Sequence, residues 1–258
     1  MKKNLTIETL LAGAALFATS SAFALNFDAN VTSNVIMGSG PGISNGSWTV
    51  DQNFDLGIEL GLRGKTRLPF PDNTFNSNGN GTYTFVNGGP KPTDPNRPVW
   101  NFEWSINSNY NSSGSMLNSF NYQLVVDIDP TLSENLFFYN LNTFKDNQFG
   151  NNLTGPGLGV KASSSSEYSE FISTNNVVQN SWSPHWIDST YYFTNGINTF
   201  NPNATGTYDI YLAAYDKNGK EVARTAIQVN VVPDSGSSFA LLGLGIIGLG
   251  FIARRRRA

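Results

Sequence analysis

Apolar and polar residues alternate in several short stretches of the chain. The clearest is FNYQLVVDI, residues 120–128, in which every second residue is apolar and Asn121, Gln123 and Asp127 take three of the four positions between them. A period of two residues is that of a β-strand with one face in a core and the other toward solvent. The sequence therefore predicts a strand here.

The same alternation recurs in VWNFEWSIN, residues 99–107, where Trp100, Phe102 and Trp104 share one side. Such a stripe is expected in the core, since burial is the usual place for aromatic residues, although an exposed stripe would form a sugar-stacking platform. Further strands are predicted at residues 57–63 and 81–86. Residues 207–232 read as a closing hairpin with Asn218-Gly219 at its turn.

No body segment of ten or more residues shows a helical period, and glycine- and asparagine-rich turns separate the predicted strands. This pattern predicts an all-β fold, a single antiparallel β-sandwich or jelly-roll-like domain over residues 25–231. Residues 87–98 and 150–170 are predicted as long loops, which often carry function in compact domains.

The composition shows what can stabilise the fold and which partners its charge disfavours. The chain has no cysteine, so a core of 18 Phe, 10 Tyr and 5 Trp must hold the fold without disulfides. It has 16 basic and 19 acidic residues; without the two ends, 10 basic and 17 acidic residues remain, a net charge of −7. An acidic body of this kind argues against nucleic acid as a partner.

The N-terminus has the three parts of a secretory signal peptide. Lys2 and Lys3 precede the apolar run LLAGAALFA, and AFA at residues 22–24 offers a small-x-small cleavage site. We therefore expect signal peptidase to remove residues 1–24 and the mature chain to begin at Leu25.

The C-terminus predicts a membrane segment. Residues 237–253 carry no charge, and their length lies near the lower limit for a span, which needs ~20 apolar residues. Four arginines follow and are expected to stay cytoplasmic by the positive-inside rule: Arg254, Arg255, Arg256 and Arg257. The body would then lie outside the membrane while the tail anchors it.

Directly before this run stands a short motif made of Val232, Pro233, Asp234, Ser235 and Gly236. The order of motif, Leu/Gly-rich span and arginine cluster resembles the PEP-CTERM sorting signals of Gram-negative bacteria, most closely their VPDSG variant. Pro233-Asp234 stands where the commoner signal has Pro-Glu-Pro. The body also looks like the uncharacterised β-rich region that precedes many such tails.

The resemblance implies an exosortase as processing partner, a membrane-embedded transpeptidase-like enzyme that cleaves near the motif. It implies an inner-membrane intermediate, followed by release or re-anchoring at the cell surface or in the exopolysaccharide matrix. The motif marks a substrate and implies no activity of its own. We thus expect an exported non-catalytic protein with no catalytic residues and no cofactor, with exopolysaccharide as a candidate partner and a carbohydrate-binding module or polysaccharide-active enzyme as the alternative.

Other candidate chemistry is weak. His185 is the only histidine, and the chain has no Gly-x-Ser-x-Gly turn, so a loop residue is expected there. Asn76, Asn78 and Asn80 have the spacing of calcium-loop ligands, but Asn87 takes the place of the bidentate Glu, so a turn is expected.

Carboxylates offer two further alternatives. Asp127 and Asp129 lie ~7 Å apart at a strand end and could share a calcium ion, or simply enter a turn. A glycosidase needs two carboxylates across a sugar, and Glu59, Glu103 and the two aspartates are candidates by residue type alone.

Overall fold

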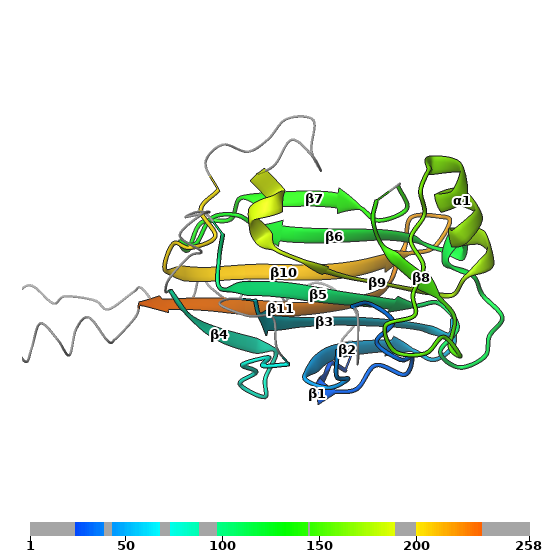
Figure 1. Cartoon of the computed structure of the whole chain (residues 1–258), viewed down its shortest axis with the longest axis horizontal. Coiled ribbons are helices and arrows are strands. Elements are labelled where there is room, and N and C mark those ends of the chain that lie inside the picture. The colour runs from blue at the N-terminus through cyan, green and yellow to red at the C-terminus, as the bar shows by residue number, and fades with distance from the viewer. Residues whose placement is uncertain are drawn as a thin grey trace, which may run out of the picture.

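The computed structural model describes residues 24–38, 43–67, 73–87, 97–143, 145–188 and 200–233. These residues form two β-sheets stacked face to face (Figure 1). Sheet A has six strands in the order β1 (Asn26–Ala29), β2 (Trp48–Asn53), β3 (Ile58–Thr66), β5 (Trp100–Asn107), β9 (Val177–Trp182) and β8 (Gln148–Gly150). Sheet B has five, in the order β4 (Thr82–Asn87), β11 (Glu221–Pro233), β10 (Gly206–Tyr215), β6 (Asn121–Asp127) and β7 (Leu136–Asn140). The β-rich two-layer fold expected from the sequence is confirmed.

The core lies between the two sheets. Trp100, Phe102 and Trp104 of β5 have no exposed surface and belong to one large cluster with the inward residues of β6 and β10. Aromatic rings meet across the interface, as where Trp100 lies 5.6 Å from Tyr208, between ring centroids. The prediction that the aromatic stripe is structural is therefore confirmed.

The outer face of sheet A is polar and yet buried. Every residue of β5 is buried, including Asn101, Glu103 and Ser105 on the side away from the core. Residues 30–37, which we call the N-terminal strap, lie against this face: Ile36 N–H donates to Gln179 Oε1 (2.8 Å), and Gln179 Nε2 donates to Asn34 O (3.0 Å). The strap exchanges hydrogen bonds with the sheet and so satisfies part of this buried polar face.

Two departures from the predicted fold stand out. First, β4 and β11 pair in parallel, whereas an antiparallel sandwich was expected. The alternation that identified each strand carries no information on its direction. Parallel pairing is possible because more than 130 residues, ample for a crossover connection, separate these strands in sequence.

Second, the predicted loop 150–170 contains the start of a helix, α1 (Ser165–Thr174). Ser164 caps it by accepting from the Glu167 N–H (3.2 Å), and Glu167 Oε2 accepts in return from the Ser163 N–H (2.6 Å). This reciprocal capping starts a helix whose interior is rich in serine. Two 3₁₀ turns, η2 (Leu117–Ser119) and η3 (Pro184–Asp188), complete the described elements.

The membrane-related predictions fall largely outside these ranges. Within the described residues, no helix is long and apolar enough to cross a membrane. The predicted signal peptide, apart from residue 24, and the predicted span at residues 237–253 lie outside the described residues, as do Arg254, Arg255, Arg256 and Arg257.

Candidate functional site

The sorting motif begins inside a sheet. Strand β11 continues to Pro233, so Val232 and Pro233 are its last residues, opposite Val86 and Asn87 of β4. Both are exposed at the strand end. Asp234, Ser235 and Gly236 lie outside the described residues. The first two residues of the motif therefore belong to the folded domain.

The structure does not bring Glu59 and Glu103 together. Register places Glu59 opposite Asn107, four residues from Glu103 on β5. At ~3.4 Å of rise per residue, this offsets the two residues by about 14 Å along the strands. Glycosidase pairs lie at most ~9.5 Å apart, so these two glutamates are not such a pair.

Both glutamates are engaged in the buried polar face. Glu103 Oε2 lies 2.6 Å from Arg63 Nη2, and its Oε1 lies 3.4 Å from Lys65 Nζ. Glu59 accepts from the Thr32 N–H and hydroxyl (2.9 Å each) and from Gln52 Nε2 (2.6 Å). Burial raises the pKa of Glu59, and these hydrogen bonds oppose the rise. Glu59 therefore fastens the N-terminal strap to sheet A.

Asp127 and Asp129 shape a turn after β6. Asp127 Oδ1 accepts from the Asp129 N–H (3.0 Å) and the Asn135 N–H (2.9 Å), while Asp129 Oδ1 accepts from the Thr131 N–H (2.9 Å). Burial raises the pKa of Asp127, and the bonds to Thr131 lower that of Asp129. Among the described residues no group of three or more His, Cys, Asp or Glu could hold a metal ion. The turn alternative is the one that the contacts support.

The asparagine-rich segment before β4 is a turn, as predicted. Asn78 Nδ2 donates to the hydroxyls of Thr82 (2.8 Å) and Thr84 (3.0 Å), and Asn80 Oδ1 accepts from the Thr82 N–H (3.2 Å). Asn76 adopts a left-handed conformation with φ 54°, which asparagine tolerates. The amide groups are thus directed at the turn itself.

His185 lies in η3, where its Nδ1 is 2.6 Å from the hydroxyl of Ser183 and its ring is 5.7 Å from that of Trp186. The serine and histidine belong to one local turn. This is a structural contact of the kind expected for a loop histidine.

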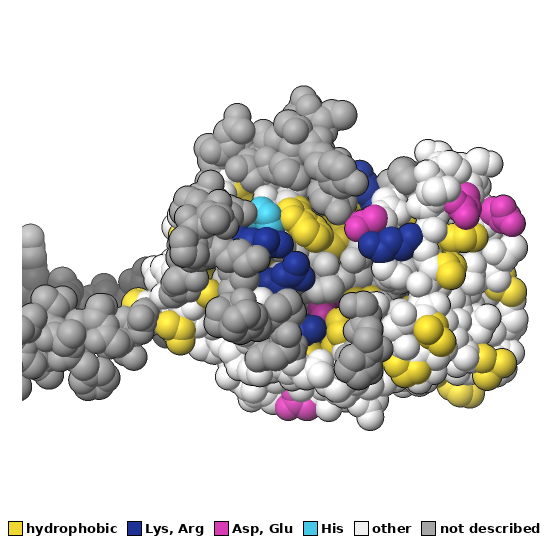
Figure 2. Space-filling model, viewed as in Figure 1, with side chains coloured by type: hydrophobic (Ala, Val, Ile, Leu, Met, Phe, Trp, Pro, Cys, Tyr) yellow, Lys and Arg dark blue, Asp and Glu magenta, His cyan; other side chains and the backbone are white. Residues whose placement is uncertain are grey.

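Lys and Arg side chains gather in the middle of the face shown in Figure 2, close to the histidine. Burial and the nearby Arg97 both lower the pKa of Arg67, and Glu103 opposes them. Segments 68–72 and 88–96 adjoin these residues in sequence and lie outside the described ranges. No site is assigned to this cluster.

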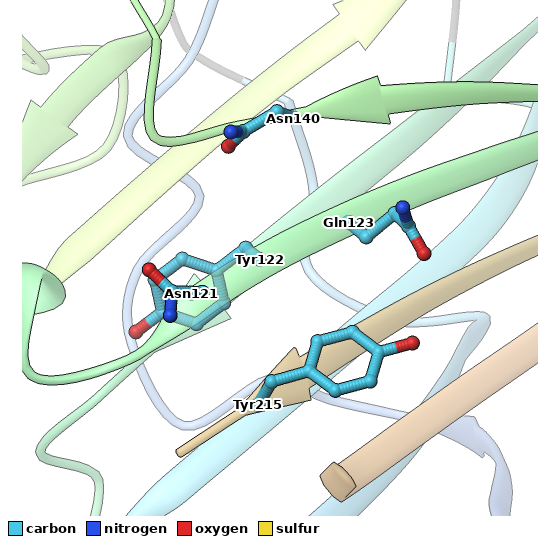
Figure 3. Close-up of a pocket in the computed structure, with 5 residues that line it drawn as sticks. All are labelled: Asn121, Tyr122, Gln123, Asn140 and Tyr215. Carbon is cyan, nitrogen blue, oxygen red and sulfur yellow. The ribbon is translucent and has the colours of Figure 1, made fainter. Parts of the chain in front are cut away.

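A shallow open pocket of about 380 Å³ lies on sheet B and was missed by sequence reasoning. Its lining residues come from three neighbouring strands: Asn121, Tyr122 and Gln123 from β6, Asn140 from β7 and Tyr215 from β10 (Figure 3). The signal available in the sequence was the polar side of the predicted strand 120–128. Its neighbours could not be known without the strand order.

Comparison with known proteins identifies the tail. Residues 231–257 match the VPDSG-CTERM motif, about a tenth of the chain. No curated protein and no solved structure matched the chain. The motif match confirms the resemblance inferred from the sequence and supports export toward the cell envelope of a Gram-negative bacterium, with an exosortase as processing partner.

Proposed function

We propose that the chain is an exported, non-catalytic protein that an exosortase processes near residues 232–236 and delivers to the cell surface or extracellular matrix. The observation that carries this proposal is the VPDSG-CTERM match at residues 231–257. Signal peptidase would remove residues 1–24, and residues 237–253 with the arginine cluster would hold the chain in the inner membrane until the tail is cut.

The fold is compatible with this route. Because β11 leads directly into the motif, a folded body would stand close to the membrane and to a membrane-embedded enzyme. Because Val232 and Pro233 are paired with β4, we expect the end of β11 to separate from β4 before the enzyme can bind the motif in its active site.

The test is expression in a Gram-negative host that contains an exosortase for this motif, followed by fractionation and mass spectrometry. The parent should yield surface protein that begins at Leu25 and lacks peptides containing Arg254 to Arg257. An Asp234→Ala variant should remain in the inner membrane with its C-terminal peptides intact.

Asn230→Ala is the matched control. Asn230 belongs to β11 and pairs with Thr84 of β4, but it precedes the matched motif. This variant should be processed like the parent. Surface-localised parent protein that retains its peptides through Ala258 would contradict the proposal, and so would normal processing of Asp234→Ala.

A further inference from the structure

The outer face of sheet B has a trough at the end of the sheet away from the tail. Along β10, Tyr211, Ala213 and Tyr215 point to this face, since the alternate residues Ile210, Leu212 and Ala214 lie in the core. Ala213 has no exposed surface and stands between the two tyrosines. The hollow lies beside Ala213, toward β6 and β7, where Tyr215, Gln123 and Asn140 line the pocket of Figure 3.

Strand register supplies the sides of this trough. Ala213 lies opposite Gln123 of β6 on one side and Arg224 of β11 on the other, and Gln123 in turn lies opposite Asn140 of β7. Asn121 lies opposite Tyr215. The trough is the pocket of Figure 3, formed by β6, β7 and the end of β10.

The amides of the trough have free hydrogen-bonding capacity. Among the described residues, no hydrogen bond engages the side chains of Asn121 and Gln123. Asn140 uses its Oδ1 to accept from the Asn142 N–H (2.9 Å), which leaves its amide donors available. Each amide can both donate and accept, so it can bind the paired hydroxyls of a sugar ring.

The trough carries no net charge. Arg224 binds Glu221 through two hydrogen bonds, and its guanidinium lies 4.1 Å from the ring centroid of Tyr211. With these charges paired, the remaining groups are amides and phenols. An anionic polymer would require cations without partners, whereas a neutral polyhydroxylated chain needs amides for its hydroxyls and aromatic faces for its C–H groups.

The position of the trough fits an extracellular ligand. Glu221, at the start of β11, pairs with Tyr215, and the strand then runs twelve residues to Pro233 at the tail. At ~3.4 Å per residue, this puts the trough about 40 Å from the tail. Figure 1 shows β11 leaving the sheet at the end opposite α1. The trough would therefore lie at the end of the domain farthest from the membrane while the tail is anchored.

We infer that this trough binds an uncharged polysaccharide, with Tyr215 stacking on a sugar ring and Gln123 and Asn140 bonding the sugar hydroxyls. The site gives the proposed surface protein a partner. This inference rests on the proposed function only in that export would bring the chain into contact with extracellular polysaccharide.

The test is affinity electrophoresis of the purified full chain in detergent, in gels containing hydroxyethylcellulose, galactomannan or the anionic polymer alginate. The chain should be retarded by at least one neutral polymer and not by alginate. Tyr215→Ala and Gln123→Ala should each weaken that retardation about tenfold, because each removes one direct ligand contact.

Asn230→Ala is again the matched control. It removes an amide from β11 near the tail, far from the trough, so this variant should bind like the parent. Thermal melting checks that all variants fold. Retention by alginate alone, no retention by either neutral polymer, or unchanged binding by folded Tyr215→Ala would overturn the inference. Concentration-dependent dimerisation lost in Tyr215→Ala would instead assign the face to a second copy of the chain. None of these outcomes bears on tail processing, so the two proposals fail separately.

Discussion

Replacing Arg63 with Met is the sharpest test of the buried polar face. The guanidinium of Arg63 is fully buried and binds Glu103 through Nε (2.7 Å) and Nη2 (2.6 Å). Its Nη1 donates to the carbonyls of Ser44 (3.0 Å) and Gly46 (2.6 Å). The ring of Trp48 lies 4.0 Å from it. Arg63 thus joins β3, β5 and the segment that leads into β2.

Removing this side chain leaves the buried Glu103 carboxylate with Lys65, whose Nζ lies 3.4 Å from Oε1, as its ion-pair partner among the described residues. Breaking a buried ion pair at one partner destabilises proteins by about 3–5 kcal/mol. Because domains are stable by about 5–15 kcal/mol, Arg63→Met should remove a large part of the free energy of unfolding.

The double variant Arg63→Met/Glu103→Leu distinguishes two causes of the loss in stability: the missing Arg63 contacts and the unpaired Glu103 carboxylate. Replacing both partners by apolar residues of similar size often restores stability, so the double variant should unfold at higher urea concentration than Arg63→Met. Urea unfolding followed by tryptophan fluorescence gives both values. A loss below about 1 kcal/mol for Arg63→Met, or a double variant less stable than the single one, would refute the reasoning.

Three further predictions concern the core, a carboxyl group and a cap. Trp104 is fully buried with its ring 6.2 Å from that of Trp182, so Trp104→Ala should lower the free energy of unfolding by about 3–5 kcal/mol; an unchanged urea midpoint would be incompatible with the core assignment. Burial between the sheets raises the pKa of Asp51 from 3.8 to about 6, although its Oδ2 accepts from the Arg224 N–H (2.9 Å). The folded state then binds this proton more tightly than the unfolded state. As pH rises from 4 to 6, the stability of the parent should therefore fall relative to that of Asp51→Asn, by on the order of 1–2 kcal/mol after solvent screening. Above pH 7 the difference between the two proteins should stay constant. Urea midpoints of the two proteins across this range should diverge as pH rises, and parallel curves would count against the shift. Ser164→Ala should destabilise the protein by about 1 kcal/mol through loss of the α1 cap, with Ser169→Ala as the exposed control; equal melting temperatures of the two variants would show that the cap is unimportant.

The strands with an alternating pattern could be predicted because one of their faces enters the core. Residues 99–107 and 120–128 and the hairpin at residues 207–232 correspond to β5, β6, β10 and β11. Alternation also indicated which side of β5 is apolar. It could not indicate that Glu103 and Asn101 on the other side are buried, because their side-chain partners Arg63 and Ser181 lie 40 and 80 residues away in sequence.

The candidate sites also differ in whether the sequence could predict them. The tail was recognisable because its motif, span and charges follow one another in sequence, and the match at residues 231–257 confirmed it. The trough required the pairing of Tyr215 with Asn121 and of Gln123 with Asn140, which unite residues far apart in the chain. Helix α1 was missed although Ser164 and Glu167 have the spacing of a capping box, since its serine-rich interior lacks a helical apolar period.

The placement of β11 also has a mechanical consequence. This strand lies inside sheet B, with ten residue pairs to β10 and six to β4, and it is the strand to which the tail is joined. Hydrogen bonds in a sheet run roughly across the strands. A pull on the tail therefore acts along β11 and loads the rows on both sides in shear, so that many bonds share the force. A pull perpendicular to the strands, as at the open end of a hairpin, would instead break the inter-strand hydrogen bonds one after another. A protein held at a cell surface by this strand would resist drag without unfolding from its point of attachment.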